Sequence, residues 1–287
     1  TKLKELIGKI NFYNEISFDI NLDQFPSIFF GIEQAWLDYR AEGRLNLFEN
    51  AFSKGKKNIP INGLVWMGGL DNMKQQIAEK IDNGFTCVKL KIGALDFEQE
   101  LDLIRQTRKE YGEKDIELRL DANGAFGPGE ALEKLKRLSE HQIHSIEQPI
   151  KAKQWDEMAS LCEQSPIPIA LDEELIGINK LEDKVELLEH TKPQYIILKP
   201  SLIGGFESAN EWTNMAVKHG VGWWATSALE SNIGLNAIAQ WVASYETAMP
   251  QGLGTGQLYT SNIPSPLEIK KGFLHYNPKK EWAVDFI

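Results

Sequence analysis

From residue 59 onward, the hydrophobic and polar positions of the chain repeat in a regular order. Short runs of β-branched and other apolar residues alternate with longer, charged stretches that have the apolar period of a helix. This pattern predicts eight strands, at residues 59–67, 87–93, 116–123, 145–149, 167–173, 195–201, 222–231 and 249–256. It predicts seven helices between them, at residues 73–83, 97–111, 128–141, 154–164, 179–190, 207–219 and 233–245.

The predicted strands are apolar on both faces, which is typical of a parallel sheet covered by helices. Alternation sustained over eight strands favours a closed barrel, and residues 59–266 are therefore expected to form a TIM-like (β/α)7β barrel of the α/β class. An open, doubly wound sheet remains an alternative on the pattern alone. The glycine fingerprint G-x-G-x-x-G of dinucleotide-binding sheets is absent after the first strand.

The two ends of the chain have a different pattern. Residues 26–40 predict an amphipathic helix that begins at Pro26, a residue suited to the first helical position, and a shorter helix is expected over residues 2–10. Residues 267–287 alternate aromatic and polar positions without a helical period. We expect residues 1–58, mainly helical, and the returning segment 267–287 to pack together as a small α+β cap beside the barrel.

The composition excludes some partners. The chain has 31 Lys and Arg against 41 Asp and Glu, a net charge of −10, which disfavours nucleic acid and anionic membrane as partners. It contains no apolar stretch of about 18 residues, and its first residues lack a signal-peptide pattern. The only two cysteines, Cys87 and Cys162, fit buried free thiols. The sequence thus predicts a soluble, cytoplasmic protein, and it leaves open whether the protein is a homo-oligomer.

Charged residues end most of the middle strands, although burying a charge without a partner is costly. Successive ones are 25 to 30 residues apart from the second strand to the sixth, about one strand–helix repeat. The carboxyl ends of barrel strands meet at one mouth, where barrel enzymes have their active sites. The residues, in strand order, are Lys89 and Lys91, Asp121, Glu147, Asp172, and Lys199.

Three converging carboxylates would repel each other unless a cation lay between them. Their oxygens are hard ligands, and no histidine or cysteine joins them, so Asp121, Glu147 and Asp172 predict a site for Mg2+ or Mn2+. A single acidic residue at this position commonly caps the next helix; the set of three, flanked by lysines, indicates a metal site. Lysines near a cation and near each other are expected to have a lowered pKa, which suits a general base.

Several residues near these six can be interpreted either as structural or as functional residues. Asn123 either orients Asp121 or is only a turn residue, and Glu173 either begins a helix or supports the metal site. Hydroxyls and glycine amides after the last two strands suit a substrate carboxylate, although Ser231 also fits a helix N-cap. The candidates for substrate binding are Ser227, Ser231, Gly252 and Gly254.

Five motifs in combination resemble the enolase superfamily, in its muconate-lactonizing subgroup. They are VKLKIG (88–93), LDAN (120–123), IEQP (146–149), LDEE (171–174) and LKP (198–200). The resemblance implies a (β/α)7β barrel with a cap built from both chain ends. Family members begin with capping strands and a flexible lid loop, and we expect both to be missing from this chain, which would weaken the exclusion of water.

Within the subgroup, TSALESNIGLN (226–236) and GLGTGQLY (252–259) are most similar to members that form o-succinylbenzoate in menaquinone biosynthesis. That similarity implies a metal-dependent syn-dehydration of a succinyl-bearing cyclohexadiene carboxylate, a small-molecule substrate. Lys91 would take the proton α to the carboxylate and return a proton to the departing hydroxide. Lys199 would stabilise the enediolate from the opposite face, and Lys89 would set the charge around Lys91.

Other functions remain open on the sequence. Two opposed lysines serve racemisation of N-acyl amino acids equally well. Dipeptide epimerisation is less favoured, because the Asp-x-Asp typical of those enzymes is replaced by GLGTG at residues 252–256. A non-catalytic barrel that binds a ligand is the alternative from another class, disfavoured because a costly cluster of charges is kept.

Overall fold

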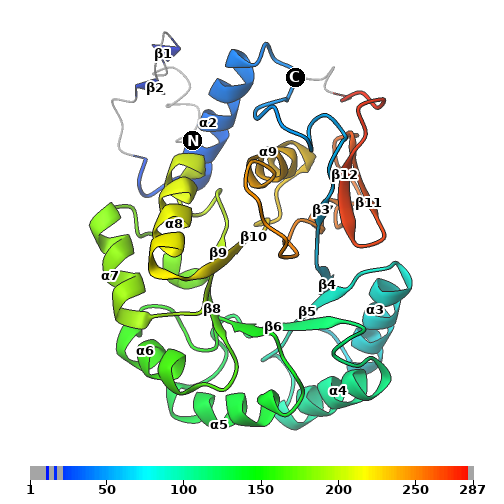
Figure 1. Cartoon of the computed structure of the whole chain (residues 1–287), viewed down its shortest axis with the longest axis vertical. Helices are drawn as coiled ribbons and strands as arrows, with labels where there is room; N and C mark the ends of the chain where they lie inside the picture. The colour runs from blue at the N-terminus through cyan, green and yellow to red at the C-terminus, as the bar shows by residue number, and fades with distance from the viewer. Residues whose placement is uncertain (1–10, 13–15, 18–21, 284–287) are drawn as a thin grey trace.

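The computed structural model describes residues 11–12, 16–17 and 22–283 (Figure 1). Its centre is a curled sheet of seven parallel strands in the order β10-β9-β8-β7-β6-β5-β4. Each strand pairs with its neighbour along the chain, as the strand–helix alternation predicts. The strands are β4 (Gly63–Val65), β5 (Cys87–Lys91), β6 (Glu117–Asp121), β7 (Ser145–Glu147), β8 (Ile169–Leu171), β9 (Tyr195–Leu198) and β10 (Gly222–Ala225).

Seven helices connect and cover these strands (Figure 1). Each corresponds to a stretch that was predicted to be helical, and its ends differ from the predicted ends by a few residues. Their apolar faces pack against the outside of the sheet in one continuous core. They are α3 (Leu70–Asp82), α4 (Phe97–Glu110), α5 (Pro128–Ser139), α6 (Trp155–Gln164), α7 (Leu181–Thr191), α8 (Gly205–His219) and α9 (Asn232–Val242).

The eighth predicted strand, residues 249–256, is reduced to two bridging residues. Gln251 pairs with Ile61 and Gly252 with Thr226, so this segment joins the two edges of the sheet. A Cβ on Gly252 would lie 2.2 Å from Thr226 Oγ1, so only glycine allows this close approach. Pro250 has no amide hydrogen to extend the pairing. The chain then enters a 3-10 turn, η2 (Thr255–Gln257).

The first predicted strand, residues 59–67, is divided between two sheets. Only β4 belongs to the barrel. Strand β3 (Ile59–Pro60) instead pairs with β12 (Phe273–Tyr276). Because β12 also pairs with β11 (Leu267–Lys270), the three strands form an antiparallel sheet. The Phe52 and Tyr276 rings, from the two segments expected to form the cap, lie 6.0 Å apart between centroids. That residues 1–58 and 267–287 together form a separate cap stays a prediction.

The segment before residue 59 contains the predicted helix α2 (Pro26–Arg40). It packs against α8 and α9, where Phe30 and Phe206 meet edge to face at 5.2 Å. Figure 1 shows α2 and the three-stranded sheet on different sides of α9. Ahead of α2, β1 (Asn11–Phe12) pairs with β2 (Ile16–Ser17), so this region is not only helical as expected. The helix expected over residues 2–10 lies outside the described residues.

Two adjacent tryptophans of β10 point to opposite faces of the sheet, as successive strand residues must. Trp224 is buried inside the barrel, where the Arg119 guanidinium lies 4.3 Å from its ring. Trp223 packs on the outside against Trp241 of α9, at 5.9 Å between ring centroids.

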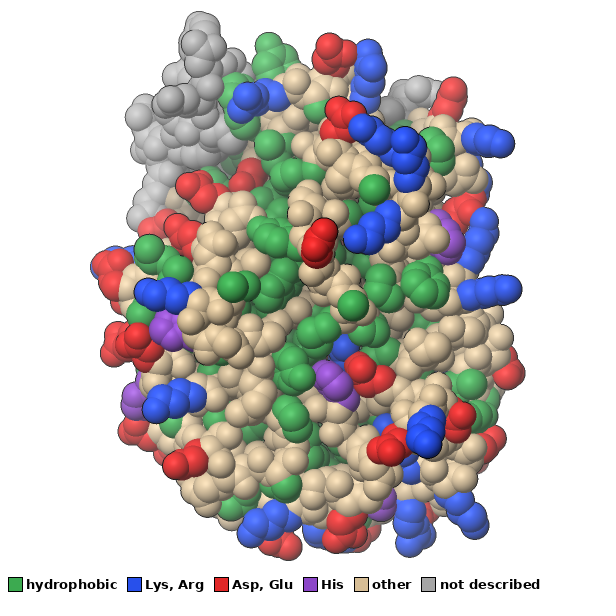
Figure 2. Space-filling view, viewed as in Figure 1, with side chains coloured by type: hydrophobic (Ala, Val, Ile, Leu, Met, Phe, Trp, Pro, Cys, Tyr) green, Lys and Arg blue, Asp and Glu red, His purple; other side chains and the backbone are tan. Residues whose placement is uncertain are grey.

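The exposed surface carries side chains of both charges. On the face in Figure 2, acidic and basic side chains are interspersed rather than gathered by sign. Cys87 and Cys162 are both buried and free, as predicted. In the described part of the chain, no helix combines the length and apolar character needed to span a membrane.

Candidate active site

The six charged side chains predicted to converge lie together at the carboxyl ends of the parallel strands. Lys91, Asp121 and Glu147 are direct register partners across β5, β6 and β7. Asp172 directly follows β8, and Lys199 directly follows β9. In the next two strands, Glu147 pairs with Ala170 and Leu171 with Ile196, so Asp172 and Lys199 lie further along their strands than the register partners of the preceding charged residues. The parallel order of consecutive strands still places side chains from five strands at one mouth.

The ammonium groups and the carboxylates form a network of ion pairs. Lys89 Nζ lies 2.7 Å from Glu147 Oε2 and 3.0 Å from Asp121 Oδ2. Lys91 Nζ lies 2.9 Å from the same Asp121 oxygen, and Lys199 pairs with Asp172. All three carboxyl side chains are only 1% exposed, so the lysines offset a large part of the cost of burying them.

The pKa values follow from this burial and pairing. The pKa of Glu147 is raised to about 8, mainly by burial and secondly by the negative charge of Asp121. Burial opposes ionisation of Asp121 as well, but Lys89 and Lys91 outweigh it and lower its pKa to about 2. Burial works against the charged forms of Lys89 and Lys199, yet the facing carboxylates outweigh it and raise both pKa values. That direction is opposite to the lowering expected for a lysine beside a divalent cation.

The donor set fits a divalent metal ion. Among the described residues, no three acidic, histidine or cysteine side chains are arranged as a ready chelate. Lysine ammonium groups instead lie against oxygens of all three carboxylates. Yet the oxygens are hard ligands from adjacent strand ends, and Glu147 Oε1 is buried without a hydrogen-bond partner. A cation among Asp121, Glu147 and Asp172 would satisfy that oxygen and supply the positive charge that buried carboxylates need.

Asn123 is both a turn residue and part of the site. Asn123 has a positive φ of 43° and begins a turn that continues through Gly124, whose φ is 72°. Its Oδ1 accepts a hydrogen bond from Lys91 Nζ at 2.6 Å, and its Nδ2 donates to Glu173 Oε1 at 2.9 Å. Asn123 therefore fixes the position of Lys91 and links it to Glu173, the first residue of the 3-10 turn η1 (Glu173–Leu175).

Gln148 is a support that the sequence reasoning missed. It is fully buried, and its Oε1 accepts hydrogen bonds from the amides of Asp172 at 3.1 Å and Glu174 at 3.3 Å. Its Nε2 donates to Glu174 Oε2 at 3.0 Å. The side chain thus fixes the backbone that carries Asp172. Its place directly after Glu147 was visible in the sequence, but its partners, 24 and 26 residues away, were not.

We expect Gln148→Ala to lower the free energy of unfolding by roughly 2–3 kcal/mol, because it leaves buried amides and a carboxylate oxygen unpaired. Chemical denaturation with the metal-free protein measures this. Gln164→Ala, at an exposed position of α6, is the control and should change the stability by less than about 0.5 kcal/mol. A loss of similar size in both variants would contradict the supporting role.

A cavity of about 330 Å³ opens above the charged cluster. Three of the four predicted substrate-binding residues, Ser227, Gly252 and Gly254, line it. Ser231 does not; it occupies the N-cap position of α9, without a capping hydrogen bond from its side chain, and lines a separate cavity instead. The remaining walls are mainly apolar or hydroxyl-bearing and come from Asn62, Leu64, Trp66, Leu202, Thr226, Ala228, Leu229 and Thr255.

The hydrogen bonds of the cavity walls show which polar groups are already paired within the protein. Ser227 Oγ donates to Glu230 Oε2 at 2.6 Å, and the Gly252 amide donates to Ala225 O at 2.8 Å, so neither donor is free. Asn62 Oδ1, Thr226 Oγ1 and Thr255 Oγ1, by contrast, are buried and have no hydrogen-bond partner. These are missed residues of the cavity; the two-residue period from Asn62 through Leu64 to Trp66 was the available signal for the first.

Comparisons with known proteins agree with this geometry. A sequence model of the family described as enolase C-terminal domain-like matches residues 72–280. An o-succinylbenzoate synthase of Desulfotalea psychrophila is 52% identical over 259 residues, which cover 90% of this chain and 70% of that protein. The crystal structure of MenC from the same organism superposes with a TM-score of 0.83, covering 88% of this chain and 69% of that one.

More distant proteins also match. An N-succinylamino acid racemase of Amycolatopsis is 25% identical over 85% of this chain and 64% of its own length. A muconate lactonizing enzyme structure superposes with a TM-score of 0.76 at 24% identity, over 88% of this chain and 72% of its own. The chain belongs to the enolase superfamily. Members of this superfamily use a divalent metal ion, typically Mg2+.

Proposed function

We propose that this chain has o-succinylbenzoate synthase activity, a dehydration in which a carbon–oxygen bond of a succinyl-bearing cyclohexadiene carboxylate is broken. The observation that carries the proposal is a cluster of three buried carboxylates flanked by lysines at one barrel mouth. It occurs in a chain that is 52% identical to an o-succinylbenzoate synthase over 90% of its length. The substrate would be a small carboxylate bound in the cavity above the cluster.

The carboxylates of Asp121, Glu147 and Asp172 would hold Mg2+, or Mn2+ in its place. When bound, the ion supplies positive charge that stabilises the substrate carboxylate as it gains negative charge. The fit rests on the oxygen donors, on their near-complete burial and on the unpartnered Glu147 Oε1. The finer choice between the two ions depends on ligand rigidity and on metal supply.

Lys91 would be the base. Lys91 lines the cavity, and its Nζ is held between Asp121 Oδ2 and Asn123 Oδ1, at 2.9 Å and 2.6 Å. In the neutral form it would take the proton α to the carboxylate, and the electrons left behind would move into an enediolate. The hydroxyl on the neighbouring carbon then leaves with a proton from Lys91, so that water is released and the ring becomes aromatic.

Lys199 and Lys89 would act by charge. Lys199 reaches the cavity from β9, on the opposite side from Lys91 on β5, and would stabilise the enediolate oxygens from that face. Lys89 is buried and paired with both Asp121 and Glu147, so it would keep the charge around Lys91 balanced. Asn123 and Glu173 would support Lys91 through their hydrogen bonds.

The decisive test is turnover of the succinyl-bearing cyclohexadiene substrate by the purified protein, followed by the ultraviolet change on aromatisation. We expect turnover that requires added Mg2+. N-succinyl amino acid racemisation is the second candidate, favoured by opposed lysines and by the Amycolatopsis relative. Exchange of the α-proton of N-succinyl amino acids in D2O, without turnover of the cyclohexadiene, would favour that candidate and contradict the synthase.

A further inference from the structure

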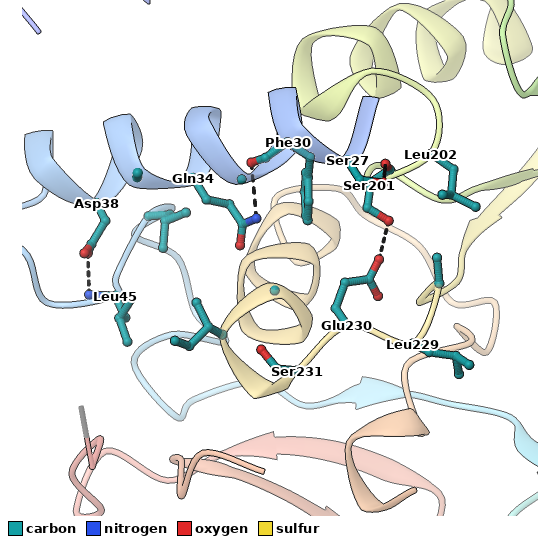
Figure 3. Close-up of a pocket in the computed structure, with 16 residues that line it drawn as sticks. Ser27, Phe30, Gln34, Asp38, Leu45, Ser201, Leu202, Leu229, Glu230 and Ser231 are labelled. Carbon is teal, nitrogen blue, oxygen red and sulfur yellow. Dashed lines mark hydrogen bonds between the residues drawn. The ribbon is translucent and has the colours of Figure 1, made fainter. Parts of the chain in front are cut away.

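A second cavity, of about 510 Å³, lies between α2 and the loops that follow β9 and β10 (Figure 3). It is separate from the active-site cavity, but three residues, Leu202, Ala228 and Leu229, line both. These three apolar residues therefore form a partition between the two cavities. The charged groups Lys91 and Lys199 line the active-site cavity only.

Leu229 is held in an unfavourable backbone conformation at this partition. Its φ is 69°, a left-handed value that costs free energy for a leucine. Its amide donates to Ser227 Oγ at 3.0 Å, and its carbonyl oxygen accepts from the Tyr259 hydroxyl. These bonds fix the backbone from which the side chain extends into the cavity wall, whereas Leu229 itself is 42% exposed and lies outside the core.

Glu230 ties this turn to the neighbouring strand and to the cap. Its Oε2 accepts from Ser227 Oγ at 2.6 Å. Its Oε1 accepts from Ser201 Oγ, two residues after Lys199, in the bond drawn in Figure 3. Ser201 O in turn accepts from Ser27 Oγ of α2 at 2.9 Å. Within the described chain Glu230 has no ion pair, so its carboxylate serves to join the two loops.

A substrate whose reacting carboxylate lies at the charged cluster must direct its remaining chain toward the rest of the cavity, where the partition is part of the wall. We propose that Leu229 is a specificity-determining residue that limits the length of the substrate's acyl chain. This proposal rests on the proposed function. Glu230 is the positioning residue that keeps Leu229 in place. Removing the Leu229 side chain joins the two cavities and admits cyclohexadiene carboxylates with acyl chains longer than succinyl.

The test compares the wild-type protein with Leu229→Gly on the succinyl substrate and on its homologue with a six-carbon adipoyl chain. Glycine adopts the positive φ without strain, so the turn persists while the side chain is removed. We expect the kcat/KM ratio of adipoyl to succinyl substrate to rise at least about tenfold, the effect of relieving a clash with one or two methylenes. Leu181→Ala, at a position 45% exposed that lines neither cavity, should leave the ratio unchanged.

The positioning role of Glu230 has its own readout. Glu230→Ala should raise the same ratio, because both serine hydroxyls lose their acceptor. Glu230→Gln should preserve the wild-type ratio, since its amide oxygen still accepts from one serine while its amide nitrogen donates to the other, whose hydroxyl rotates. A merely structural role would lower kcat/KM for both substrates by the same factor in Glu230→Ala and leave the ratio as in wild type.

Crystal structures of the wild-type protein and of Leu229→Gly separate this proposal from the proposed function. One continuous cavity in the variant is expected whatever the enzyme turns over. Failure of wild-type turnover together with a merged cavity would overturn the function but keep the partition. A cavity that stays divided in Leu229→Gly, or an unchanged substrate ratio in an active variant, would overturn the specificity role.

Discussion

Replacing Lys91 by alanine is expected to lower kcat by about 10⁴-fold, the upper end of what one general base contributes. The other two lysines of the cluster are poorly placed to replace it: Lys199 comes from the opposite side of the mouth, and Lys89, on the same strand as Lys91, is buried between two carboxylates. Solvent exchange of the substrate's α-proton should disappear with turnover. Both are measured directly, by ultraviolet absorbance and by NMR in D2O.

Lys91→Arg separates the basic role from the role of charge. Arginine keeps the positive charge beside Asp121 but stays protonated at any accessible pH, so it cannot accept the proton. We therefore expect Lys91→Arg to be as inactive as Lys91→Ala. Lys134→Ala, a half-buried lysine of α5 paired with Glu130 outside the barrel mouth, is the control and should retain full activity. Exchange that persists in Lys91→Ala would assign the base to another residue.

The predictable part of the site was the part fixed by repetition. Once strands are parallel and consecutive, residues at equal depth in each repeat must meet, and Lys91, Asp121 and Glu147 do so in direct register. The opposite directions of Trp223 and Trp224 follow from equally simple geometry, because the side-chain period of a strand is two. These conclusions needed only the hydrophobic pattern and the spacing of charges.

The parts that sequence reasoning missed depend on partners far along the chain. Residues 59–67 form one apolar run, and only the pairing of Ile59 and Pro60 with β12, more than 210 residues later, divides it. The residue type of Ser227 suggests substrate binding, but its hydroxyl donates a hydrogen bond to the carboxylate of Glu230 instead. Gln148 likewise looks unremarkable until Asp172 and Glu174 fold against it. Such choices among hydrogen-bond partners are made by tertiary packing.

Conservative replacement of any one metal-site carboxylate, Asp121→Asn, Glu147→Gln or Asp172→Asn, is expected to abolish Mg2+ binding and activity together. An amide keeps the size of the side chain but lacks the charge that a hard divalent cation requires. Because metal bound only to the folded state stabilises it, Mg2+ at about 100 times its Kd should stabilise the wild-type protein by about 2.7 kcal/mol. We expect no such stabilisation in these variants.

Calorimetric titration and thermal denaturation with and without Mg2+ measure this separately from turnover, and EDTA should reverse the wild-type effect. Glu117→Gln is the matched control: Glu117 begins the same strand that Asp121 ends, and the glutamine oxygen can still accept from Arg119 Nε. It should bind Mg2+ as the wild type does, because it lies at the far end of the barrel from the mouth. Undiminished Mg2+ binding in any of the three carboxylate variants would remove that residue from the metal site, whatever its effect on activity.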